Sequence, residues 1–242
     1  MANLLVEMGN TALKAAWSEG SVLGKTFRYQ GEKTMAFVKS LVEKQQPEVM
    51  VIVSAKDVSS EDEEVFASLC QHLIVLDRNH KDVLLGYELP DYLSCDRVAS
   101  LVAARYLFKD KPCIVFDFGT TLTVDCMDST GRYQGGNISL GCRTRFKALN
   151  RYSKTLPLVD TPADPAEEVF SLQSSMESGV INGIMFEIEG YISRKPDHIV
   201  IFTGGDSVYF AKRMKNSIFV VCNLVLMGLA LITDDYVKKN LL

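Results

Sequence analysis

The chain has 242 residues, of which 47% are hydrophobic and 23% are charged, and its formal net charge is -4. These proportions are typical of a globular protein. The sequence contains no basic cluster of the kind that binds nucleic acid. Its longest apolar stretch, NLVLMGLALI, is too short to span a bilayer. We therefore predict that the partners are small molecules or proteins, and that neither nucleic acid nor a membrane is among them.

The six cysteines lie far apart in the sequence and form no C-x-x-C pair. Most of them have apolar neighbours, which is typical of buried, reduced thiols. The first residues show no basic region followed by an apolar one, so we expect no secretory signal. These features predict a cytoplasmic protein.

Hydrophobic patterns predict alternating strands and helices in the first half of the chain. The expected strands, the first three of them an antiparallel meander, are residues 3–8, 12–18, 22–30, 49–55 and 73–77. The expected helices are residues 32–44, 59–72 and 96–108. Ser60 and Glu63 have the spacing of a capping box at the start of the second helix.

The segment KDKP at residues 109–112 resembles a linker, and it divides the chain into expected domains at 1–110 and 111–242. Beyond it we expect a strand at 113–118, a hairpin at 121–136, a helix at 143–153, a proline-containing loop at 157–169, a helix at 172–192, a strand and turn at 198–205 and a final helix at 223–239. The alternation of strands and helices predicts an α/β protein.

One pattern occurs twice, about 110 residues apart, as LLVEMGNTALK near the start and VFDFGTTLTVD in the second half. Glu7 aligns with Asp117, and a glycine follows two residues later in both copies. After the glycine the copies align either directly or with a slip of one residue, which places Leu13 on Leu122. The repetition indicates that the same structural motif occurs in both halves of the chain.

A carboxylate at a strand end, followed by glycine and hydroxyl residues in a hairpin, is typical of a site for a polyphosphate. The backbone N–H groups near Gly9 and Gly119 can approach phosphates closely because no side chain intervenes. Hydroxyl groups add donors, and the carboxylate can hold a metal ion or its water. Either copy alone could be an ordinary tight turn. Two copies favour a nucleotide held from both sides.

A third glycine-containing turn, Thr203-Gly204-Gly205, lies between an apolar strand and an expected helix. Its exposed backbone could pack against an adenine ring or a ribose, although a plain strand-to-helix turn is the common alternative. The sequence contains neither G-x-x-x-x-G-K-[ST] nor G-x-G-x-x-G, so nothing supports a P-loop or Rossmann site. The three histidines lack metal-ligand spacing, and no G-x-S-x-G is present, which argues against a zinc site or a serine hydrolase.

Together, the two hairpins and the late glycine turn resemble the actin-like ATPase and sugar-kinase superfamily. Within it, the order of motifs over nearly the whole chain resembles the type III pantothenate kinases. The matches are D-x-G-N-T at Glu7-Met8-Gly9-Asn10-Thr11, Y-x-x-P at Tyr87 and Pro90, G-x-D-R at Ser94-Cys95-Asp96-Arg97, D-x-G-T at Asp117-Phe118-Gly119-Thr120, G-G-x-I-x-P-G at residues 135–141, and the S-G and T-G-G turns at Ser178-Gly179 and Thr203-Gly204-Gly205.

The resemblance implies two duplicated ribonuclease-H-like domains with mixed sheets flanked by helices, and ATP in the cleft. It implies transfer of the γ-phosphate of ATP to the 4′-hydroxyl of pantothenate, the first step of coenzyme A biosynthesis. The implied cofactors are ATP, Mg²⁺ and a monovalent cation, K⁺ or NH₄⁺. The implied assembly is a homodimer whose interface helps to form the substrate pocket.

The resemblance also assigns roles to single residues. Asp96 is the expected catalytic base, and Asp117 is the expected ligand of the monovalent cation. The expected substrate-binding residues are Tyr87, Ser94, Cys95, Asp96 and Arg97. The expected ATP-binding residues are Glu7, Gly9, Asn10, Thr11, Lys14, Thr120, Gly204 and Gly205.

Each of these side chains also has a structural alternative. Asp96 could cap the helix that it begins, and Arg97 could form a surface ion pair. Tyr87 could serve in packing alone. Lys14 points to the phosphates if its position in the strand matches that of Asn10, and otherwise lies in solvent.

Four positions depart from the family pattern. Glu7 replaces an aspartate, Ser94 a glycine and Leu140 a proline. Leu172 lies near the place of the family's substrate-binding threonine, with Ser171 and Ser174 as its hydroxyl-bearing neighbours. A glycine with positive φ could not be replaced by serine without strain. Two alternatives therefore remain open. The chain could be a kinase of the same fold that acts on another small hydroxyl compound, or a regulatory protein that binds ATP with little turnover.

Overall fold

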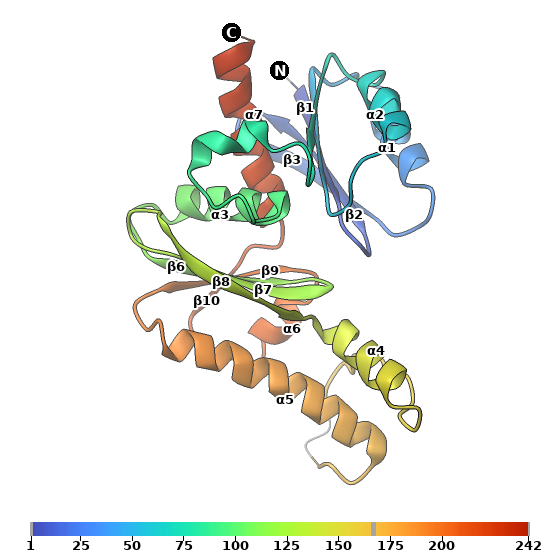
Figure 1. The fold of residues 1–242 in the computed structure, drawn as a ribbon, viewed down its shortest axis with the longest axis vertical. Coiled ribbons are helices and arrows are strands. Elements are labelled where there is room, and N and C mark those ends of the chain that lie inside the picture. Colours follow the sequence, from blue (N-terminus) through green and yellow to red (C-terminus); the bar gives the residue numbers. More distant parts are fainter. Residues whose placement is uncertain (1, 166–167, 242) are drawn as a thin grey trace. The chain divides into compact units, whose positions relative to one another are not determined.

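The computed structural model of the protein describes residues 2–165 and 168–241. The chain divides into two compact units, one made of Met1–Leu107 with Asn223–Leu242 and the other of Phe108–Cys222. Each unit contains one five-stranded sheet with helices against it (Figure 1).

The sheet of the first unit has the strand order β3-β2-β1-β4-β5. Its strands are β1 (Ala2–Met8), β2 (Leu13–Glu19), β3 (Val22–Tyr29), β4 (Val49–Ser54) and β5 (His72–Leu76). Its helices are α1 (Thr34–Val42), α2 (Ser60–Ala67), the 3₁₀ helix η1 (Asp82–Tyr87), α3 (Cys95–Leu107) and α7 (Leu224–Asn240). Strands β1, β2 and β3 form the expected antiparallel meander, whereas β4 runs parallel to β1 and β5 runs parallel to β4.

The second unit repeats this topology. Its strands are β6 (Cys113–Phe118), β7 (Thr121–Met127), β8 (Tyr133–Leu140), β9 (Ile199–Gly204) and β10 (Ile218–Val220), in the order β8-β7-β6-β9-β10. Its helices are α4 (Cys142–Tyr152), α5 (Leu172–Ser193) and α6 (Ser207–Ala211). Strands β6, β7 and β8 form a second antiparallel meander, and β9 and β10 continue the sheet in parallel. The expected fold class, a duplicated α/β unit with mixed sheets, is confirmed.

The core of the first unit follows the alternation of side chains along its strands. Leu4 and Val6 of β1 point to the same face, where they pack with Val38 of α1 and Phe66 of α2. Helices α3 and α7 pack against each other and against other parts of the same sheet. Both faces of the sheet are therefore covered, which is typical of α/β proteins.

Helix α7 corrects the expected domain boundary, which had placed residues 223–239 in the C-terminal domain. Its Gly228 lies so close to α3 that an added Cβ would be 2.8 Å from the Cα of Ala99 and nearer still to the Ala99 carbonyl. Only a residue without a side chain permits this contact. The helix is apolar on most of its surface, so its pattern alone did not show which unit it joins.

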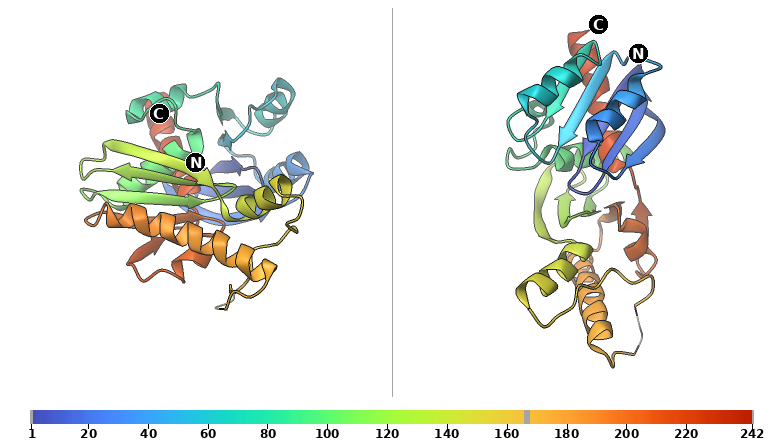
Figure 2. Two further views of the ribbon diagram at one scale, coloured as in Figure 1. Left: turned by 60° about the horizontal axis from the view of Figure 1, so that its bottom comes forward. Right: turned by 90° about the vertical axis from the view of Figure 1, so that its right-hand side faces the viewer.

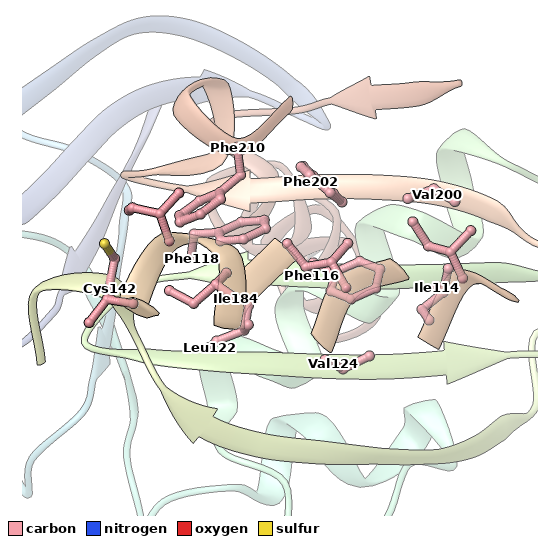
Figure 3. Packing of buried hydrophobic residues seen from close by; sticks show 14 of the residues in the cluster. Ile114, Phe116, Phe118, Leu122, Val124, Cys142, Ile184, Val200, Phe202 and Phe210 are labelled. Atoms are coloured by element: carbon pink, nitrogen blue, oxygen red, sulfur yellow. The ribbon is translucent and has the colours of Figure 1, made fainter. Parts of the chain in front are cut away.

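The core of the second unit lies between the sheet and α5. Phe116 and Phe118 of β6 gather with Phe202 of β9 and Phe210 of α6, and Ile184 of α5 covers them (Figure 3). The rings of Phe118 and Phe210 are stacked with centroids 5.1 Å apart. Helix α5 runs along this face of the sheet (Figure 2). The aromatic cluster thus fixes the ends of β6 and β9, where two of the predicted motifs lie.

Two local expectations were wrong. Ser59 and not Ser60 caps α2, because its hydroxyl accepts a hydrogen bond from the backbone N–H of Asp62 at 3.1 Å, and the helix already ends at Ala67. The predicted capping box was therefore placed one residue too late. The S-G pair at residues 178–179 is not a turn, since it lies inside α5.

Candidate functional site

The first hairpin joins β1 to β2 through residues 9–12, since Met8 pairs with Leu13. The backbone N–H of Gly9 donates to the carbonyl of Ala12 at 3.1 Å, which closes the turn. Gly9, Asn10 and Thr11 are all exposed. The turn can therefore offer backbone and hydroxyl donors to a ligand.

The second hairpin has the same construction but is one residue shorter. Phe118 pairs with Leu122, and the backbone N–H of Gly119 donates to the carbonyl of Thr121 at 3.0 Å. Because Met8 pairs with Leu13 in the first copy, the alignment that slips by one residue and places Leu13 on Leu122 is the correct one.

Glu7 and Lys14 occupy opposite positions on β1 and β2 and form an ion pair, with Nζ 3.5 Å from Oε2. Both side chains are only about one-fifth exposed, at 19% and 21%. Burial raises the pKa of the Glu7 carboxyl, Lys14 opposes this rise, and the negative charge of Asp96 adds to it. The alternative that Lys14 lies in solvent is therefore wrong. Asp96, the expected base, is close enough to Glu7 for their charges to interact.

A cavity of about 330 Å³ opens beside the first hairpin. It is lined by the hairpin itself, by residues 54–58 at the end of β4, and by Thr34 at the start of α1. Lys56 is the basic side chain among its lining residues, and Asp57 and Asp62 are the acidic ones. Polar and apolar residues both line it, and its hydroxyl groups and Lys56 could donate to a phosphate.

The late glycine turn and the second hairpin lie side by side in the second unit. In the parallel pairing of β6 with β9, Asp117 is opposite Thr203 and Phe118 is opposite Gly204. The backbone at Gly204 has φ +88°, which favours glycine. An added Cβ there would lie 2.6 Å from the N and O atoms of Phe118 and would also overlap Oδ1 of Asp117. The structure thus brings together the expected residues Asp117, Thr120, Gly204 and Gly205.

The loop that ends β8 supports this hairpin. Both the backbone N–H of Gly141, at 3.0 Å, and the hydroxyl of Thr144, at 2.7 Å, donate to the carbonyl of Thr120. Arg145 of α4 donates through Nε to the carbonyl of Leu140 at 2.8 Å and pairs with Glu187 of α5. Leucine in place of the family's proline therefore sits in a loop that side chains of α4 hold in place. No motif in the sequence marked Thr144 or Arg145 for this role.

The segment with the expected catalytic residues begins α3. The backbone N–H of Val98 donates to the carbonyl of Ser94 at 3.0 Å, so Ser94 is at the N-cap position and Asp96 lies in the first turn. Asp96 is therefore not the cap. Among the described non-glycine residues only Glu88 and Asp110 have positive φ, so serine at position 94 introduces no strain of that kind. Arg97 is only 7% exposed, which excludes a surface ion pair.

Two of the expected substrate residues have side chains that already bind the protein. The thiol of Cys95 is buried and donates to the carbonyl of Asp77 at 3.2 Å, and burial raises its pKa to about 11. Any contact of Cys95 with a substrate would therefore come from its backbone. The hydroxyl of Tyr87 donates to Oδ2 of Asp235 at 2.8 Å, and burial followed by this contact raises the pKa of Tyr87.

Asp77 follows β5 and holds the loops on either side of it. Its buried carboxylate accepts hydrogen bonds from the backbone N–H groups of Val58, Asn79 and His80 at 2.9–3.0 Å. It also contacts Nδ1 of His80 at 2.9 Å. Burial alone would raise the pKa of Asp77, but these hydrogen bonds outweigh burial and lower it. The contact with the Asp77 carboxylate raises the pKa of His80. No motif in the sequence marks Asp77 for this role, and its only signal is an acid at the end of a buried strand.

The Asp77–His80 pair predicts how stability depends on pH. Since the pKa of His80 is raised above its usual value of about 6.5, its contribution is complete below that pH and is lost as pH rises through the raised value. The lowered pKa of Asp77 makes its contribution complete above about pH 4 and lost in stronger acid. We expect the free energy of unfolding, measured with urea, to fall as the pH rises above about 6.5, and to fall less in His80→Gln. The exposed His72→Gln is the control. An equal fall in His80→Gln and wild type would contradict the assignment.

The described residues contain no cluster of three or more His, Cys, Asp or Glu side chains that could hold a metal ion. However, Oε2 of Glu7 is buried and accepts no hydrogen bond, although Lys14 lies 3.5 Å away. A carboxylate oxygen of this kind suits a cation that arrives with phosphate ligands of its own. The residues therefore fit Mg²⁺ carried by ATP better than a metal held by the protein alone.

Comparison with known proteins agrees with this geometry. Residues 3–194 match the sequence profile of the type III pantothenate kinases. A type III pantothenate kinase of Azobacteroides pseudotrichonymphae is 32% identical over 93% of this chain and 94% of its own length. One from Flavobacterium johnsoniae is 33% identical over 94% of this chain and 95% of its own length.

Solved structures share the fold at low sequence identity. A Campylobacter jejuni protein described as a Baf-family transcriptional activator has a TM-score of 0.63 at 20% identity and covers 98% of both chains. The activator of 2-hydroxyisocaproyl-CoA dehydratase from Clostridium difficile, with bound ADPNP, has a TM-score of 0.60 at 12% identity and covers 100% of this chain and 97% of its own. At such identities the likeness concerns the fold alone. The sequence profile and the curated relatives, in contrast, cover most of this chain at about one-third identity, and the chain belongs to the type III pantothenate kinase family.

Proposed function

We propose that this protein transfers the γ-phosphate of ATP to the 4′-hydroxyl of pantothenate, the reaction of its family in coenzyme A biosynthesis. The observation that carries the proposal is the pair of hairpins, each with an acid on the first strand and a closed glycine turn at the same place in the same sheet topology. Both hairpins are proposed to bind ATP, the first through Gly9, Asn10, Thr11 and Lys14 and the second through Thr120.

Phosphoryl transfer depends mainly on placing the acceptor in line with the phosphate and on neutralising charge. Asp96 is proposed to accept the proton of the attacking hydroxyl. Its position in the first turn of α3 leaves it partly exposed, so an acceptor can reach it. Arg97 is proposed to bind the substrate carboxylate, for which a guanidinium offers paired donors. Ser94 contributes through the N-terminal backbone of α3.

The ATP of this family arrives with a divalent cation, which neutralises charge on the phosphates during transfer. Glu7 and Lys14 are proposed to lie at the phosphate end of the nucleotide. When the nucleotide binds, Lys14 can exchange its contact with Glu7 for a contact with a phosphate. The Glu7 carboxylate would then be available to hold the divalent cation. Asp117 is proposed to bind the monovalent cation, K⁺ or NH₄⁺, and the turn at Gly204 and Gly205 to pack against the nucleoside.

A homodimer and a cytoplasmic location are also proposals. The dimer is supported by an apolar groove of about 720 Å³ between α4 and α5, which is lined by Leu140, Leu149, Leu156 and other apolar side chains. Exposed Phe186 and Tyr152 on the same two helices add apolar surface. The cytoplasmic location is supported by six cysteines that form no disulfide. Among the described residues, no helix has both the length and the apolar character needed to cross a membrane.

A panel of acceptors tests the proposed substrate. Purified protein is incubated with ATP, Mg²⁺ and K⁺ and with pantothenate, pantetheine or small sugars and sugar acids, and the phosphorylated products are identified by mass spectrometry. We expect pantothenate to have the highest kcat/KM, EDTA to abolish turnover, and omission of K⁺ and NH₄⁺ to lower it. Preference for another acceptor would support a different kinase of this fold, and binding of ATP without any product would support a regulatory protein.

A further inference from the structure

The connection between β5 and α3, taken together with Cys95 as the first residue of α3, comprises residues 77–95, carries Tyr87 and leads directly to Asp96. It is longer than most connections in compact domains, and long connections with little regular structure of their own are usually functional or disordered. Here the connection is neither loose nor fully helical, because η1 covers only Asp82–Tyr87. Side chains hold it at its base, its middle and its tip.

A hydrogen bond joins the two ends of the loop at its base. The thiol of Cys95 donates to the carbonyl of Asp77 at 3.2 Å, which joins the last residue of the loop to the first. The carboxylate of Asp77 is itself fixed by Val58 and His80. The ends of the loop therefore have a defined separation and orientation.

The middle of the loop is closed by Lys81. Its Nζ donates to the carbonyl of Asp91 and to the carbonyl of Leu93, both at 2.8 Å. An ammonium group has three donors, so two of them are used within the loop. Leu93 is fully buried, and it lies immediately before Ser94. Lys81 thus determines the path of the chain as it enters α3.

The tip of the loop is held by two helices. The hydroxyl of Tyr87 donates to Asp235 of α7 at 2.8 Å, and Arg105 of α3 donates to the carbonyl of Tyr87 at 2.7 Å. The next residue, Glu88, has φ 54°, a left-handed conformation that a residue with a side chain adopts only when its surroundings impose it. Because the Tyr87 hydroxyl donates to Asp235, its single proton is not available to a substrate at the same time.

We propose that residues 77–95 form a preorganised substrate loop, and that Lys81 and Asp235 are its positioning residues. They hold the backbone around Tyr87 and ahead of Asp96 in the shape that binds the acceptor, without touching the acceptor themselves. The inference rests on the proposed function, since it takes the acceptor to be pantothenate. It assigns to Tyr87 a role in shaping the loop, and a contact with the substrate through its ring or backbone.

Kinetics of Lys81 variants test the middle of the loop. Lys81→Met removes both hydrogen bonds but keeps a long side chain, and we expect the KM for pantothenate to rise about tenfold while the KM for ATP changes less than about twofold. Lys81→Arg, which keeps donors at this position, should restore most of the affinity. Lys44→Met, at an exposed position in the same unit, is the matched control.

Hydrogen exchange tests the loop without using activity. Amides of residues 82–93 should exchange faster in Lys81→Met and in Asp235→Ala than in wild type, because the bonds that close the loop are lost. Asp234→Ala is the matched control on the same helix, since Asp234 pairs with Lys238 and not with Tyr87. The Asp235 bond is at the surface, so we expect its effect on the KM for pantothenate to be roughly threefold.

The outcomes separate the two proposals. If wild type phosphorylates pantothenate but Lys81→Met leaves the KM or the exchange of residues 82–93 unchanged, the inference is overturned alone. If Lys81→Met raises the KM for both substrates equally, the loop has no special relation to the acceptor and the inference is also overturned. Absence of turnover in wild type overturns the proposed function, and the exchange data then still decide whether Lys81 and Asp235 hold the loop.

Discussion

Replacing Asp96 by asparagine is expected to lower kcat about 10²- to 10⁴-fold, the range typical for loss of a general base. Asparagine has nearly the same shape and can still accept hydrogen bonds, but it cannot take up the proton of the acceptor hydroxyl. The loss should therefore appear in kcat, with the KM values changed little. Initial rates of phosphopantothenate formation at saturating ATP and pantothenate measure it.

Stability is the control for this variant. Asp96 lies in the first turn of α3, where a negative charge interacts favourably with the helix N-terminus by less than about 1 kcal/mol. The thermal unfolding of Asp96→Asn should therefore stay close to that of wild type. Asp197→Asn, at an exposed position in the second unit, should keep full activity. If Asp96→Asn turned over as fast as wild type, Asp96 would not be the base.

Replacing Gly204 by alanine is expected to destabilise the second unit by about 4 kcal/mol. A residue with a side chain at φ +88° is strained by about 1–3 kcal/mol, and the added methyl group would overlap Phe118 and Asp117 at a similar cost. The aromatic cluster behind the turn leaves Phe118 no room to retreat, since its ring is in contact with Phe202 and Phe210. Urea unfolding followed by circular dichroism measures the effect.

Gly205 provides the matched control in the same turn. An added Cβ there would meet only the carbonyl of Phe118, at 3.9 Å, which is an ordinary contact. Gly205→Ala should therefore fold with nearly the stability of wild type, within about 1 kcal/mol. If this turn packs against the nucleoside, Gly205→Ala should instead raise the KM for ATP. Equal stability of the two variants would contradict the close approach that we describe at Gly204.

Much of the fold was predictable because its strands and helices have clear hydrophobic periods. The three elements of each meander, and the long α5, lie within a few residues of their expected ranges. The short elements were not predictable in the same way. Strand β10 has only three residues, Ile218–Val220, and exists because β9 offers it a partner. Helix η1 has only six residues, DVLLGY, too few to show a helical period, and contacts with α3 and α7 hold its end.

The two halves of the candidate site differ in what the sequence could predict. The hairpins were predictable because the need for a glycine and an acid at a strand end leaves a local pattern. The side-chain contacts that hold the surrounding loops in place were not predictable. Tyr87 and Asp235 are 148 residues apart, and Arg145 and Glu187 are 42 apart, so these pairs arise only when helices pack. The departure at Glu7 likewise became interpretable only when its partner, Lys14, was seen across the hairpin.

The central claim is that this chain makes a phosphate ester of pantothenate at the expense of ATP, and one measurement tests it most directly. Purified protein is given ATP, Mg²⁺, K⁺ and pantothenate, and the mixture is followed by ³¹P nuclear magnetic resonance with correlation to protons. We expect a phosphomonoester signal that grows as the γ-phosphate signal of ATP declines and that correlates with the methylene protons at the 4′ position of pantothenate. Loss of the γ-phosphate signal to inorganic phosphate alone, or no change in either signal, would contradict the account.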